Sequence, residues 1–140
     1  IPSKTIPQGL SAMLRYNFDE SFDHLAEEMK EALQDVDTGE ITIANRSVNI
    51  NGVKVKEGAL ISLLNGNLIG SYKSLSDAVV DFLKQANTED KERITFFKGK
   101  DLETPESDKV IEKIKDIYPG HEIELHSGGQ PHYLFIISVE

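Results

Sequence analysis

The sequence predicts an α/β fold, in which a mixed sheet with a β-hairpin meander carries helices packed on it. Three observations support this. Apolar residues recur at helical spacing in three segments, two Asn-Gly pairs separate β-rich runs, and the last run is apolar without alternation. The chain has 140 residues, enough to bury roughly 70% of its unfolded surface in one core.

The first forty residues are predicted to be a loop followed by an acidic amphipathic helix. Prolines at positions 2 and 7 indicate extended chain over Ile1–Gly9. From about residue 20 to residue 36, apolar side chains form one helical stripe: Phe22, Leu25, Ala26, Met29, Leu33 and Val36. Glycine ends helices readily, so Thr38-Gly39 is expected to stop this one. We expect residues 1–40 to be a remnant of a preceding subdomain and residues 41–140 to form the α/β subdomain.

A β meander is predicted from about Glu40 to Tyr72. Asn51-Gly52 and Asn65-Gly66 each lie between two β-rich runs. A type I′ turn needs two positive φ angles, which Asn and Gly tolerate best, so each pair is predicted to close a hairpin.

The remaining chain alternates helices with strands. Ser74 is predicted to cap a helix, and residues 93–97 form the next strand. Thr104-Pro105 is predicted to begin a further helix as its N-cap and first residue, and Pro119-Gly120 to end it. The apolar run 133–139 indicates a central strand covered on both faces.

Negative charge is concentrated in one segment. The net charge is -9, and residues 15–40 hold nine acids against two bases. Such a surface repels nucleic acid and anionic lipid and attracts a basic protein. The residues expected to bind that partner are Asp23, Glu27, Glu28, Glu31 and Asp35. A merely solubilising helix face remains the alternative.

No complete catalytic or metal site is predicted. The chain has no cysteine, and its serines form no nucleophile motif. His126 and His132 flank one loop, but two histidines are too few for a zinc site, and His24 is expected on the polar side of the acidic helix. A possible ligand loop consists of His126, Gly128, Gly129 and Gln130. Its glycines could present N–H groups to an anion or simply form a tight turn.

The expected compartment is the cytoplasm, because no apolar run reaches the length of a membrane span and no leader pattern is present. The chain begins at Ile1 rather than at methionine, and we expect it to be a piece of a longer protein.

Three segments resemble one protein family. They are SKTIPQGLSA at 3–12, VNINGVKVKEG at 48–58, and the ending from GGQP at 128–131 to IISVE at 136–140. They are similar to the C-terminal region of the kinase subunit of the bacterial two-component fatty acid kinase, a dihydroxyacetone-kinase-like (DAK2 domain) or YloV-like protein.

The resemblance implies a parent enzyme that forms acyl phosphate. ATP and magnesium would bind an N-terminal domain outside this chain, and the catalytic residues would also lie outside it. This chain would be the last, DegV-like subdomain, whose acidic surface receives the basic surface of a DegV-like fatty-acid-binding partner. The alternative function is binding of fatty acid or phosphate by the loop from His126 to His132, which resembles a DegV loop that places a histidine near the lipid carboxylate.

Overall fold

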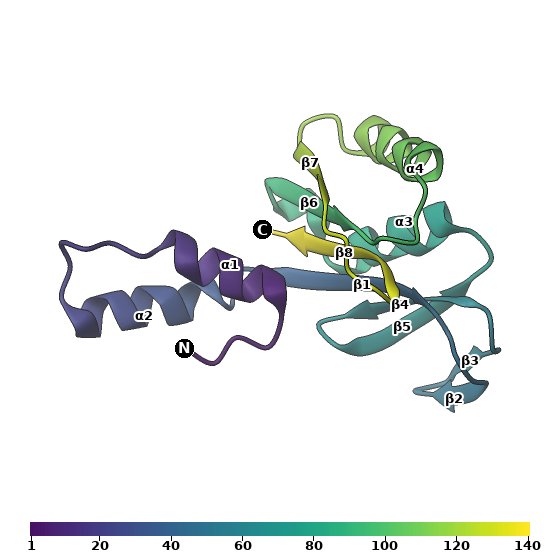
Figure 1. Cartoon of the computed structure of the whole chain (residues 1–140), viewed down its shortest axis with the longest axis horizontal. Helices are drawn as coiled ribbons and strands as arrows, with labels where there is room; N and C mark the ends of the chain where they lie inside the picture. The colour runs from purple at the N-terminus through teal and green to yellow at the C-terminus, as the bar shows by residue number, and fades with distance from the viewer.

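The computed structural model describes all residues 1–140 and contains a six-stranded mixed sheet (Figure 1). The helices are α1 (Ile6–Leu14), α2 (Phe22–Ala32), α3 (Leu75–Gln85) and α4 (Thr104–Ile117), with a 3₁₀ turn η1 (Thr88–Asp90). The strands are β1 (Asp37–Ile43), β2 (Val48–Ile50), β3 (Val53–Val55), β4 (Leu60–Leu64), β5 (Asn67–Tyr72), β6 (Arg93–Lys98), β7 (Glu122–Ser127) and β8 (Tyr133–Val139).

The sheet has the strand order β5-β4-β1-β8-β6-β7. Only β6 and β7 are parallel, and the crossover between them contains α4; the other neighbours are antiparallel. Strands β2 and β3 form a separate two-stranded sheet. The predicted α/β class with a mixed sheet is confirmed.

Both predicted Asn-Gly turns are confirmed. Asn51 and Gly52 have φ angles of 54° and 79°, and Asn65 and Gly66 have φ angles of 50° and 84°. The first pair joins β2 to β3 and the second joins β4 to β5. Two consecutive positive φ angles match the right-handed twist of the paired strands.

The core lies between one face of the sheet and helices α3 and α4. It contains 17 buried residues, of which the first in the chain is Ile41. As predicted, Ser74 caps α3 by accepting a 3.1 Å hydrogen bond from the Asp77 amide. Strand β8 is central, and its Phe135 and Ile137 are fully buried in this core.

The second face of the sheet is covered only in part, so the predicted cover on both faces of β8 holds for part of the strand. Ser138 is buried, and it lines a cavity of about 150 Å³ together with Pro7 and Ser11 of α1. Ile136 points to the same face, because side chains alternate along a strand, but it is only half-buried.

Three predicted element boundaries are wrong. Residues 6–9 belong to α1 and not to a loop, because Thr5 caps the helix and proline in a first turn loses no hydrogen bond. The acidic helix ends at Ala32, and Thr38-Gly39 lies inside β1. Helix α4 includes Thr104, and its N-cap is Glu103.

Helices α1 and α2 form a hairpin beside the sheet, seen in purple and blue at the left of Figure 1. Strand β1 leads from this hairpin into the sheet and runs across the predicted boundary after residue 40. None of the helices combines the length and apolar character needed to cross a bilayer.

Candidate functional site

The helical hairpin is joined to the sheet by a small hydrogen-bond network. The hydroxyls of Thr5 and Thr38 are 2.9 Å apart, and the Gln8 amide donates to the Leu33 carbonyl over 3.1 Å. On the sheet side, Asn65 donates to the Asp37 carboxylate over 2.8 Å. These contacts fix where α2, and therefore its acidic side chains, projects from the molecule.

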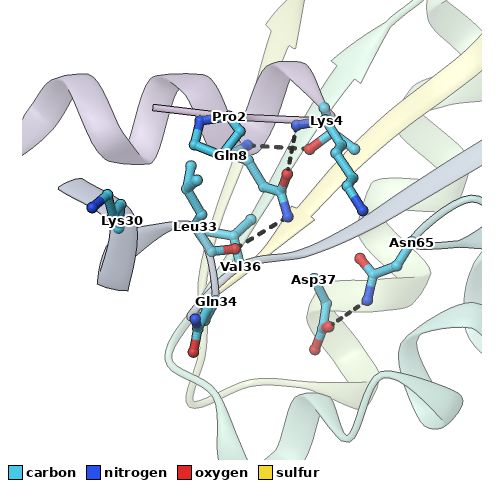
Figure 2. A pocket seen from close by; sticks show the side chains of 10 residues that line it. Pro2, Lys4, Gln8, Lys30, Leu33, Gln34, Val36, Asp37 and Asn65 are labelled. Carbon is cyan, nitrogen blue, oxygen red and sulfur yellow. Dashed lines mark hydrogen bonds between the residues drawn. The ribbon is translucent and has the colours of Figure 1, made fainter. Parts of the chain in front are cut away.

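A polar pocket of about 600 Å³ lies at this junction (Figure 2). Its Gln8, Asp37 and Asn65 side chains all take part in the network above, and Lys4 donates its backbone N–H to the Gln8 side chain. Because these polar groups have partners within the chain, the pocket is a structural joint between the hairpin and the sheet.

The predicted partner-binding acids gather mainly on α2. Asp23, Glu27 and Glu31 are exposed and lie four residues apart, so they form one row along the helix. Glu28 is half-buried in the adjacent row. Asp35 is exposed but lies after the helix, in the connection to β1.

Few cations neutralise these carboxylates. Lys30 contacts Glu27 at 3.0 Å, and His24 lies 3.6 Å from Glu28. No lysine, arginine or histidine nitrogen lies within 4.0 Å of the other three predicted acids, Asp23, Glu31 and Asp35. The polar side of α2 therefore keeps a net negative charge.

An apolar groove of about 750 Å³ lies along the hairpin between α1 and α2. Its rim includes Phe18 and Phe22, which are 89% and 83% exposed. Helical spacing places Phe22 on the side of α2 opposite the acidic row. Sequence reasoning assigned Phe22 to the apolar stripe but gave no sign of its exposure, because the buried end of α2 is at Ala32 and Leu33.

The predicted ligand loop is a closed turn. The N–H groups of Gly128 and Gly129 both donate to the Lys98 carbonyl, at 2.9 and 3.0 Å. Gln130 donates to the Phe97 carbonyl over 2.8 Å, and the His126 ring stacks on the Phe97 ring. The glycine N–H groups are thus not free for an anion, which favours the tight-turn alternative.

These features belong to a chain with recognisable relatives. The family model that matches residues 1–140 describes the FakA-like C-terminal domain of fatty acid kinase. The chain belongs to this family. An uncharacterized protein of Staphylococcus aureus strain USA300 and another of strain MRSA252 share 35% and 34% identity with this FakA-like domain over 140 residues. The match covers 100% of the chain but 26% of each relative, so the domain spans about a quarter of their length.

Solved structures show that the domain has a DegV-like fold. A fatty-acid-binding DegV family protein from Thermus thermophilus matches with a TM-score of 0.58 and 12% identity, over 95% of this chain and 55% of that protein. DegV from Bacillus subtilis, described as a fatty acid binding protein, matches with a TM-score of 0.54 and 15% identity, over 94% and 54%. The DegV-like fold expected from the family resemblance is confirmed.

Proposed function

We propose that this chain is a non-catalytic docking domain of a fatty acid kinase, and that the acidic side of α2 binds a DegV-like fatty-acid-binding protein. In this proposal, ATP, magnesium and the transfer of phosphate to the fatty acid belong to other parts of a longer protein. Family membership supports the kinase context, and the charge of α2 supports the docking role.

The observation that carries the proposal is the exposed row Asp23, Glu27 and Glu31. Like charges four residues apart destabilise a helix by roughly 0.2–0.5 kcal/mol per pair. Lys30 is the one lysine of α2, and it contacts only Glu27. A helix that keeps this repulsion in solution gains if a cationic surface covers it.

The contact must extend beyond α2. Stable interfaces bury about 1,600 Å² in total, which is more than one side of an 11-residue helix offers. Asp35 extends the negative charge into the connection with β1, so we place this connection at the edge of the interface.

A charge reversal on α2 tests the proposal. We expect Glu27→Lys with Glu31→Lys to weaken binding to the DegV-like partner, mainly through a lower association rate, because the long-range attraction is lost. Asp23 is left unchanged because an acid in the first turn stabilises the helix. Surface plasmon resonance at several NaCl concentrations measures both rates.

Glu112→Lys with Glu106→Lys is the matched control, since both acids are exposed on α4, away from the hairpin. It changes the net charge equally and should bind with nearly the wild-type association rate. Binding of the wild-type chain should also weaken as salt rises. Salt-independent binding, or equal losses in the two double variants, would contradict docking through α2.

A further inference from the structure

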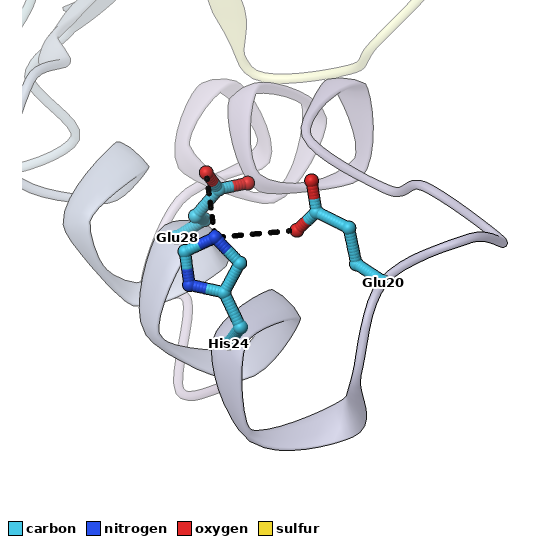
Figure 3. A group of neighbouring side chains, drawn as sticks. All are labelled: Glu20, His24 and Glu28. Atoms are coloured by element: carbon cyan, nitrogen blue, oxygen red, sulfur yellow. Dashed lines mark ion pairs between the residues drawn. The ribbon is translucent and has the colours of Figure 1, made fainter.

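A second row on α2 brings one histidine between two carboxylates (Figure 3). His24 Nε2 lies 3.6 Å from Glu20 Oε2 and 3.6 Å from Glu28 Oε1. One ligand atom from each residue lies within 4.8 Å of the other two. His24 and Glu28 project from successive turns of α2, and Glu20 reaches them from the residue before its N-cap, Ser21.

The histidine alone satisfies this arrangement poorly. A ring nitrogen carries at most one proton, so His24 Nε2 can donate to only one of the two carboxylates at a time. At 3.6 Å, moreover, both oxygens lie beyond the normal length of a hydrogen bond. The two negative groups are therefore held near one nitrogen without a bond that explains their positions.

A metal ion explains them. A tetrahedral zinc ion with bonds of about 2.0–2.1 Å keeps its ligand atoms roughly 3.3–3.4 Å apart. The two 3.6 Å separations at His24 are close to this value. We propose that Glu20, His24 and Glu28 bind a divalent transition-metal ion of the zinc type, with water as the fourth ligand.

An independent observation at Glu20 points the same way. Its Oε2 atom is shielded from solvent and has no hydrogen-bond partner, although the rest of the side chain is partly exposed. Its other oxygen accepts a 3.3 Å hydrogen bond from Asn17. Asn17 thus orients the carboxylate, in the way that neighbouring groups orient metal ligands, and leaves Oε2 directed at His24.

The donor set selects the class of ion. One imidazole nitrogen and two carboxylate oxygens suit zinc and its neighbours in the transition series, whereas magnesium and calcium prefer oxygen alone. The site does not depend on docking, since Asp23, Glu27 and Glu31 are not among its ligands. Bound metal would link the segment before α2 to the first two turns of the helix.

Isothermal titration of the tag-free, chelator-treated chain with zinc chloride tests the site. We expect one ion per chain for the wild type. His24→Ala, Glu20→Gln and Glu28→Gln should each raise the Kd at least about tenfold, because each removes one ligand. Circular dichroism before each titration establishes that the variants are folded.

Two controls separate this site from other exposed groups. Glu31→Gln removes a carboxylate from the neighbouring row of the same helix, and His126→Ala removes an exposed histidine that contacts Glu124. Both should bind zinc as the wild type does. The proposal is overturned if zinc does not bind, if His24→Ala leaves the Kd unchanged, or if magnesium binds as tightly as zinc, which would indicate diffuse attraction to the acids.

Discussion

Gly39 is a residue at which the core tolerates no side chain. It lies in β1 opposite Ile137, and a Cβ atom built on it would come 2.5–2.7 Å from three ring carbons of Phe82. Phe82 is fully buried on α3 and cannot move into solvent. The glycine therefore lets α3 approach the sheet closely, a role that differs from the helix stop predicted from sequence.

We expect Gly39→Ala to lower the free energy of unfolding by about 1–3 kcal/mol, the usual cost of overpacking a core. Urea unfolding followed by circular dichroism measures the change. Gly120→Ala is the matched control, because nothing lies within 4 Å of a Cβ atom there, and its effect should stay within about 0.5 kcal/mol. Equal effects of the two substitutions would show that the Phe82 ring yields easily.

Tyr72 couples stability to alkaline pH. Burial raises the pKa of its hydroxyl above the ordinary value, and the hydrogen bond that the hydroxyl donates to Asp81 raises the pKa further. In the unfolded chain tyrosine ionises near pH 10. The stabilisation from the protonated hydroxyl is therefore complete below about pH 10 and is lost as the pH rises above it.

Tyr72→Phe should accordingly lose less unfolding free energy than the wild type between about pH 9 and pH 11. Urea unfolding at the two pH values gives both differences. Tyr118 and Tyr133, whose pKa values are also raised by burial and nearby glutamates, remain in both proteins and cancel in the comparison. The same loss in both proteins would count against a role of Tyr72.

At the scale of elements, the sequence predicts what is decided locally. The turns at Asn51-Gly52 and Asn65-Gly66 were predictable because the φ angles depend on the two residues themselves. The end of α2 was not, because Leu33 and Val36 continue the apolar periodicity although the chain has already left the helix. Both are buried, at the turn toward β1.

The candidate sites divide in the same way. The acidic row on α2 follows from four-residue spacing, and the structure places these acids on the surface. The spacing of Glu20, His24 and Glu28 was equally visible, but a search for paired histidines passes over it. Only the folded chain shows that Glu20, which precedes the helix, directs Oε2 toward His24.

At the scale of the whole molecule, the sheet order depends on contacts between distant segments. Strand β1 pairs with β8 near the C-terminus and with β4, and no local pattern specifies either choice. The core begins at Ile41, so the helical hairpin adds no side chain to it. The α/β part should therefore be able to fold without the hairpin, provided that β1 stays whole.

Two truncated chains test this division and the boundary predicted after residue 40. The chain 37–140 keeps all of β1 and should unfold cooperatively in urea, with a lower midpoint because the cover of α1 over Ser138 is lost. The chain 41–140 lacks Asp37–Glu40, which pair with Ile136–Val139 at the centre of the sheet. Removing these residues leaves backbone groups of buried β8 without partners, so we expect 41–140 to be far less stable or unfolded. If both chains unfold at the same midpoint, the sheet does not need the start of β1, and the boundary after residue 40 is the better one.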